Sequence, residues 1–353
     1  MNSNWSPAAI LPNLTADKAV DGEIIALAPS DDPRVLAFCT AHPKFKELIS
    51  RFTNAFRVPL SPVVQIVRDD VTPKLADVEP LASFRDLVAL SVIPYARSLG
   101  LVYRNGHRIS YSNSFWLYPW MLGSDNEHIV ASTPAIQSFH VVEKFHGQSS
   151  PELSIMKLTD VDEPLFEALL RRWKRYYLGK SRRWQDRALF RSLNMAAQAA
   201  QLPAGVDATL YDLGRMIALW VSAFEILAHP RVGKSDLLQV YSLLDKVSYV
   251  ERNVAQRRYV AYRSKKPRRV LPCWLYGKLY QARCDFLHGN AIRMDRLNFT
   301  GAETGLFWVA PSLYRLALAG FLKLSSVQKA PTIFHTEPQS IIERAILRAR
   351  KGN

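Results

Sequence analysis

The stretch Leu279-Tyr280-Gln281-Ala282-Arg283-Cys284-Asp285-Phe286-Leu287-His288-Gly289-Asn290 decides how the C-terminal half of this 353-residue chain is interpreted. It closes a predicted helix over residues 272–288, and Gly289 stands where a helix would stop. Arg283 can hold a phosphate through paired charge-assisted hydrogen bonds, and His288 can transfer protons near neutral pH. Together they supply the chemistry for metal-free cleavage of RNA, because the 2′-hydroxyl of the RNA is itself the nucleophile.

The pattern Leu-Tyr-x-x-Arg-x-x-Phe-Leu-His-Gly resembles the signature helix of HEPN domains, particularly the Apea-like branch. Upstream, the segment LWVSAFEIL at 219–227 resembles the helix with an acidic residue that precedes this signature in the family. The resemblance covers about residues 165–325. It implies a helical bundle, a metal-independent endoribonuclease that acts as a homodimer, and a prokaryotic defence or toxin-like role against phage RNA or host tRNA.

Glu225 and Cys284 are two further residues whose roles bear on the function. Glu225 lies within an otherwise apolar run and needs a partner. Orienting the catalytic Arg283 and pairing with another basic residue both remain open. Cys284 stands where the family commonly has Asn, Asp or His, and we interpret it as a small buried apolar residue. This departure keeps a second function open, a non-catalytic RNA-binding or adaptor protein with a HEPN-like bundle.

The spacing of Arg283 and His288 has a geometric consequence. Five residues on an α-helix correspond to roughly 500°, so the two side chains lie about 140° apart around the axis. One copy of the helix therefore makes a loose pair. The resemblance implies that dimerisation brings two such helices together, so we expect a homodimer.

Charge is distributed unevenly along the chain. The net charge is +15, from 46 Lys and Arg against 31 Asp and Glu. Residues 1–150 contain 13 Lys and Arg against 14 Asp and Glu, a net of −1, so the remainder carries +16. A basic half that contains the Arg283 motif favours RNA as the partner, although a basic surface without a ligand has the same composition.

Two basic runs are the predicted RNA-binding residues. The first mixes cations with aromatic rings, which suits phosphate neutralisation and base stacking, but a solvated helix face with Trp173 and Trp184 in the core has the same pattern. The second precedes the signature helix, reads as an exposed loop, and has no acidic residue between Arg252 and Arg269. The predicted residues are Arg171, Arg172, Lys174, Arg175, Arg182, Arg183, Arg263, Lys265, Lys266, Arg268 and Arg269.

Other chemistries find little support in the sequence. Cys39 and His42 have metal-ligand spacing but no second pair, and no phosphate-binding Gly-rich loop occurs, so we predict no metal and no cofactor. Three cysteines give no disulfide framework, no secretory signal is visible, and no run reaches about 18 uninterrupted apolar residues. We expect a cytoplasmic protein without a membrane segment.

The predicted fold is an α+β N-terminal domain, residues 1–155, followed by a mainly α-helical HEPN-like bundle, residues 160–353. The first 20 or so residues are expected to be a loose tail, with strands at 22–29, 62–68 and 114–121 and helices at 33–56 and 81–99. Asn105-Gly106 predicts a hairpin. Helices are expected at 163–177, 185–201, 208–227, 235–247, 272–288, 305–324 and 338–351. The N-terminal domain has no assigned role, and sensing an unknown trigger for the nuclease is one candidate.

Overall fold

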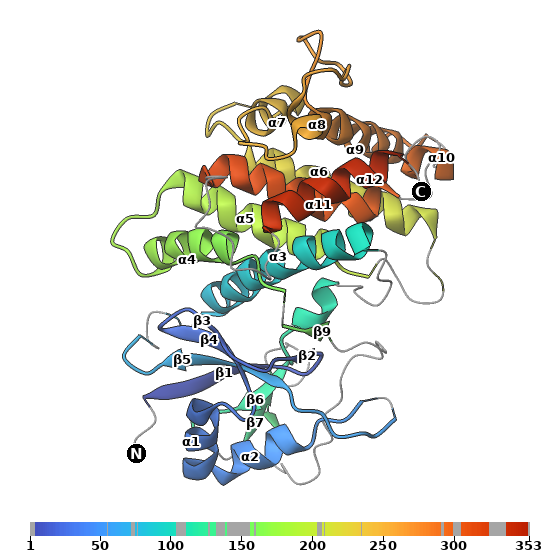
Figure 1. The fold of residues 1–353 in the computed structure, drawn as a ribbon. Helices are drawn as coiled ribbons and strands as arrows, with labels where there is room; N and C mark the ends of the chain where they lie inside the picture. The colour runs from blue at the N-terminus through green and yellow to red at the C-terminus, as the bar shows by residue number, and fades with distance from the viewer. Residues whose placement is uncertain are drawn as a thin grey trace. The chain divides into compact units, whose positions relative to one another are not determined.

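The chain divides into two compact units in the computed structural model (Figure 1). The first consists of Met1–Arg85 and Asn113–Thr159, and the second of Asp86–Ser112 and Asp160–Asn353. The predicted N-terminal domain, residues 1–155, thus includes residues 86–112, which belong to the second unit, and stops four residues before the first unit ends. The structure describes residues 4–54, 56–71, 75, 77–103, 111–125, 128–131, 138–139, 156–158, 160–202, 207, 209–233, 235–290, 293–298, 305–324 and 337–351.

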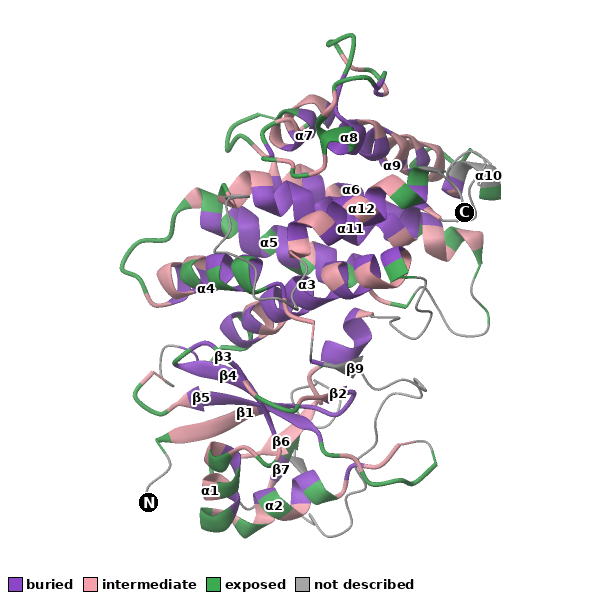
Figure 2. Ribbon diagram, viewed as in Figure 1, coloured by how far each residue is buried: buried purple, intermediate pink, exposed green. Residues whose placement is uncertain are grey.

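A four-stranded antiparallel sheet in the order β1-β5-β4-β3 forms the centre of the first unit. Its strands are β1 (Trp5–Leu11), β3 (Val20–Asp21), β4 (Ile25–Pro29) and β5 (Val63–Arg68). Strands β4 and β5 are buried almost throughout (Figure 2). The prediction of a loose N-terminal tail was wrong, because residues from Trp5 to Leu11 pair along the whole of β5.

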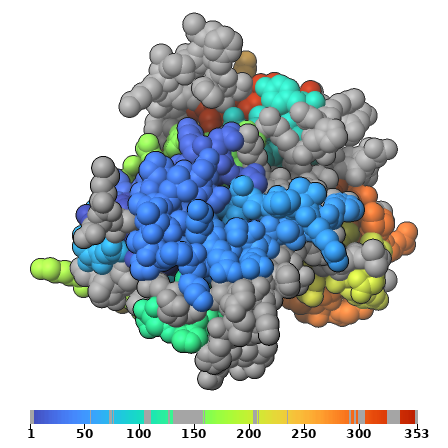
Figure 3. Space-filling view, turned by 90° about the horizontal axis from the view of Figure 1, so that it is seen from below, coloured from blue at the N-terminus to red at the C-terminus, as the bar shows by residue number. Residues whose placement is uncertain are grey.

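Two helices, α1 (Pro33–Ala41) and α2 (Pro43–Ser50), complete the core of this sheet with Val35, Phe45 and Leu48. The predicted single helix breaks at Pro43, since the residue before a proline disfavours helical backbone and His42 is not helical. In space-filling view, residues from the first part of the chain form a continuous blue surface (Figure 3).

Short strands make up the rest of the first unit. Strand β2 (Leu14–Thr15) pairs in parallel with β9 (Met156–Lys157). Strands β6 (Trp120–Leu122), β7 (Ile129–Ala131) and β8 (Ser138–Phe139) form a small antiparallel sheet. The predicted strand at 114–121 was mostly wrong, because residues Ser112–Phe115 form a 3-10 turn and the strand begins at Trp120.

The helix α3 (Val78–Tyr103) contains the boundary between the units and continues past Gly100, where its end was predicted. The helix ends at Tyr103, and the predicted hairpin turn at Asn105-Gly106 lies outside the described part of the chain. By length and composition α3 resembles a membrane span, with a mean hydropathy of 1.2 in its most apolar window, but 72% of that window is buried, as in the core helix of a soluble protein.

The second unit is mainly helical in its described residues, as predicted. Besides most of α3, its helices are α4 (Glu163–Tyr177), α5 (Trp184–Ala199), α6 (Leu210–Leu227), α7 (Leu237–Leu244), α8 (Arg252–Ala255), α9 (Leu271–Leu287), α10 (Met294–Leu297), α11 (Leu306–Leu322) and α12 (Pro338–Lys351). Capping boxes begin α6 at Thr209 and α7 at Asp236.

Aromatic side chains from three helices build the centre of this unit. The ring of Phe224 on α6 lies 4.9 Å from that of Tyr276 on α9 and 5.3 Å from that of Tyr314 on α11. Trp220 lies 5.6 Å from Tyr314, and all four side chains are fully buried. This packing fixes α6 against α9, the two helices that carry the acidic residue and the Arg-His motif.

Candidate functional site

The end of α9 presents His288. Gly289 has a φ of 70°, and the amides of Gly289 and Asn290 donate to the carbonyls of Phe286 and Asp285 at 3.4 and 3.0 Å. This is a Schellman termination, so Gly289 stops the helix as predicted. His288 is the C-terminal cap and is exposed. Within the described residues its imidazole has no hydrogen-bonding or ionic partner.

Arg283 leans back along α9 toward its N-terminus. Its guanidinium carbon lies 5.7 Å from the ring centre of Tyr280, which stands one turn earlier on α9. Side chains on a helix lean toward the N-terminus, and Arg283 follows that rule. Its Nε atom is buried and has no hydrogen-bond partner in the described structure. Among the described residues, no hydrogen bond or ring contact joins Arg283 to His288 of the same chain.

Glu225 on α6 is partly buried and lies within electrostatic reach of Arg283. Burial raises the pKa of the Glu225 carboxyl; Arg283 opposes this shift, and Asp236 adds to it. Among the described residues the two side chains form no ion pair within 4 Å, so Arg283 is a neighbour of Glu225 rather than a bonded partner. Cys284 is a free, partly exposed thiol rather than the buried residue expected from the sequence.

The first basic run is partly committed to structure. Asp186, fully buried at the start of α5, accepts from Arg172 at 3.0 Å and from Arg175 at 2.8 Å and 2.5 Å. These contacts join α4 to α5. Arg172 and Arg175, two of the predicted RNA-binding residues, are therefore engaged in ion pairs within the fold. Trp173 is fully buried, whereas the exposed members of the run are Arg171, Arg182 and Arg183. Lys174 is partly exposed.

The second basic run forms an ordered loop between Tyr259 and Arg269, which we call the basic loop. Tyr259 and Arg269 exchange backbone hydrogen bonds of 3.1 and 2.8 Å, which close the loop at its base. Arg263, Lys265, Lys266 and Arg268 are exposed on it. Arg269, which was predicted to bind RNA, is only 3% exposed and instead forms an ion pair with Asp245.

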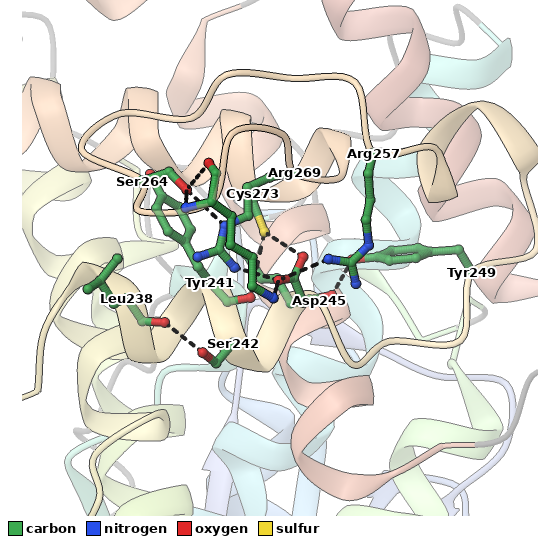
Figure 4. A network of polar contacts seen from close by, with 11 residues as sticks. Leu238, Tyr241, Ser242, Asp245, Tyr249, Arg257, Ser264, Arg269 and Cys273 are labelled. Atoms are coloured by element: carbon green, nitrogen blue, oxygen red, sulfur yellow. Dashed lines mark hydrogen bonds and ion pairs between the residues drawn. The ribbon is translucent and has the colours of Figure 1, made fainter.

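Asp245 is the residue that orders this loop (Figure 4). Its carboxylate is 7% exposed and lies 3.6 Å from Arg257 and 3.3 Å from Lys266, in addition to its contact with Arg269. Arg269 also donates to the Ser264 hydroxyl at 3.0 Å. The run itself contains no acidic residue, and its acidic partner comes from the end of α7.

The loop also lies directly on α9. The Tyr241 hydroxyl on α7 donates to the carbonyl of Tyr262 at 2.8 Å. At Gly277 on α9 an added Cβ would stand 2.7 Å from that hydroxyl and 3.1 Å from the Tyr262 amide nitrogen. Tyr241, Tyr262 and Gly277 were not predicted as site residues. The only sequence signal was a glycine inside a helical pattern, which often marks a close backbone approach.

No cluster of three or more His, Cys, Asp or Glu side chains suited to a metal occurs among the residues that the structure describes. Comparison of the chain with protein-family models, with curated proteins and with solved structures finds no match in any of the three.

Proposed function

We propose that this protein is a metal-independent endoribonuclease that cleaves RNA through the 2′-hydroxyl of the substrate. One observation carries the proposal. The helix that ends in an exposed His288 also carries Arg283, whose buried Nε lacks a partner beside the carboxylate of Glu225. An exposed imidazole is suited to proton transfer, and the partly exposed Arg283 can bind a phosphate through the terminal nitrogens of its guanidinium.

In the proposed reaction the His288 imidazole removes the proton of the 2′-hydroxyl, and the 2′-oxygen attacks the adjacent phosphorus. The bond from phosphorus to the 5′-oxygen breaks, and that oxygen takes up a proton from a second imidazole or from water. Arg283 stabilises the additional negative charge on the phosphoryl oxygens, and Glu225 orients Arg283. The products are a 2′,3′-cyclic phosphate and a 5′-hydroxyl.

Five residues of helix separate Arg283 from His288, and this spacing predicts side chains about 140° apart around the axis. We therefore propose that the active form is a homodimer in which two copies of α9 face each other. The exposed cations of the basic loop and of the first basic run would bind the RNA backbone. A role in prokaryotic defence, or as a toxin, rests on the resemblance to Apea-like HEPN domains.

The proposal is tested by incubating the purified protein with total RNA in EDTA. We expect cleavage that persists in the chelator, products with 2′,3′-cyclic phosphate ends, and loss of cleavage in His288→Ala. His128→Ala is the matched control, since His128 lies in the first unit on an exposed turn beside Asp125. Cleavage that requires Mg²⁺ and leaves 3′-hydroxyl ends would contradict the mechanism. RNA binding without cleavage would favour the adaptor function instead.

A further inference from the structure

Two neighbouring aromatic rings, each covered by a guanidinium, connect α9 to the basic loop. The Arg283 guanidinium lies 5.7 Å from the Tyr280 ring centre, the Tyr280 ring lies 6.4 Å from that of Tyr262, and the Arg263 guanidinium lies 5.1 Å from Tyr262. Arg283 and Arg263 both act on the Tyr280 hydroxyl, lowering its pKa against the larger effect of burial, which raises it. The four side chains therefore form one connected row, which we call the stacking row.

The loop side of this row is held in place by the fold. Tyr262 receives a hydrogen bond from Tyr241 at its carbonyl and packs directly on Gly277. Arg263 follows it with its backbone in the left-handed region, at a φ of 49°, which is typical of a tight turn. The buried pair of Arg269 and Asp245 anchors the far side of the loop. Little conformational entropy would be lost in these residues on binding a ligand.

The stacking row is accessible and lies in a basic setting. Tyr262, Tyr280 and Arg283 are partly exposed, and Arg263 is exposed. Exposed Lys265, Lys266 and Arg268 continue the loop beyond it. The Asp245 carboxylate, the acidic group at this loop, is already shared by three cations. Positive charge beside partly exposed rings is what proteins use to bind unpaired nucleotides, whereas duplex RNA keeps its bases stacked inside the helix.

We propose that the stacking row is the substrate subsite for single-stranded RNA next to the scissile phosphate. This inference rests on the proposed function, which it narrows to unpaired RNA. Bases stack on Tyr262 and Tyr280, and the guanidiniums that cover these rings in the free protein move to the adjacent phosphates. Arg263 binds a phosphate next to the one that Arg283 stabilises. Tyr262 and Tyr280 thus select an unpaired strand, and Arg283 and His288 cleave it.

Binding is measured with the full-length protein and a fluorescent single-stranded RNA in which every 2′-hydroxyl is methylated, so that cleavage is impossible. A blunt duplex of the same length and chemistry is the comparison. We expect Tyr262→Ala and Tyr280→Ala each to weaken single-strand binding roughly 5- to 150-fold, as for loss of one stacked base, with duplex binding unchanged. Tyr262→Phe and Tyr280→Phe keep the ring and should bind nearly as wild type.

Tyr211→Ala is the matched control, because Tyr211 is a 70% exposed tyrosine of the same unit on α6, and its removal should change neither affinity. A 2-aminopurine base in the single strand reports stacking directly, with quenching in the wild type and the Phe variants that the Ala variants lose. Unchanged single-strand affinity in the Ala variants, or an equal loss for both RNAs, would overturn the inference. A parallel cleavage assay on unmodified RNA tests the proposed nuclease separately, so the two failures are distinguishable.

Discussion

Two carboxylates of the second unit lie in contrasting surroundings. Asp245 has cations on several sides, one of them the almost fully buried Arg269. Glu225 is partly buried beside Arg283 without a bonded cation among the described residues, and burial raises its pKa. The first carboxylate stabilises the fold as an ion, whereas the second is more easily kept in its protonated form. Each arrangement leads to a prediction about a single substitution.

Replacing Asp245 with Asn should cost about 3–5 kcal/mol of unfolding free energy, because it leaves the buried Arg269 charge unpaired. Lys266→Met should cost less than about 1 kcal/mol, since the Lys266 side chain is 55% exposed and its ion pair is screened by water. Urea unfolding of the two variants beside the wild type makes the comparison. Equal costs would show that Arg269 does not depend on this carboxylate.

Glu225→Gln should stabilise the protein at neutral pH. A carboxyl whose pKa is raised in the folded state binds more protons there than in the unfolded chain, so stability falls as the pH rises through the raised pKa. Glutamine lacks this titration. Thermal unfolding over a pH series should show the variant above the wild type at neutral pH and level with it below the ordinary pKa of Glu. A variant that is less stable at neutral pH would mean that attraction to Arg283 outweighs the burial of the charge.

At the scale of elements, α9 and the basic loop depend on each other through one glycine. Alanine at position 277 should raise helix propensity by up to about 1 kcal/mol, but its Cβ would stand 2.7 Å from the Tyr241 hydroxyl. Overpacking of this kind costs about 1–3 kcal/mol, so we expect Gly277→Ala to give a net loss of about 1 kcal/mol. Urea unfolding measures it.

The same substitution in a Tyr241→Phe background is its control. Without the hydroxyl the closest obstacle is gone, and Gly277→Ala should cost less than it does in the wild type. Additive effects of the two substitutions would show that the Tyr241 hydroxyl is not the group that excludes a side chain at position 277.

At the scale of the whole molecule, the spacing of Arg283 and His288 on α9 predicts that two inactive variants complement each other in a mixed dimer. Arg283→Ala and His288→Ala should each abolish RNA cleavage. A mixture in which subunits exchange should recover part of the activity, because one mixed dimer can combine an intact Arg283 with an intact His288. Cleavage of labelled RNA measures recovery, and sedimentation measures the oligomer. A mixture that stays inactive despite exchange, or an active monomer, would refute the shared site.

The helical character of the second unit and the bounds of several of its helices could be predicted from the sequence alone. The predicted bounds of α4 and α12 agree with the structure, and Gly289 ends α9. These features depend on local information: apolar periodicity, caps and the left-handed preference of glycine. The strands β4 and β5 were found for the same reason, since β-branched and apolar runs are visible without knowledge of their partners.

Contacts between residues that are distant in the sequence could be identified only from the tertiary structure. Strand β1 was missed because its pairing energy comes from β5, more than 50 positions away. Arg269 was predicted to be a free, RNA-binding cation, but it forms an ion pair with Asp245, which lies 24 positions earlier in the sequence. Arg172 and Arg175 are likewise occupied by Asp186. Charge and periodicity act along the chain and can be predicted, whereas the partner of a buried charge or of a strand is set by packing between elements.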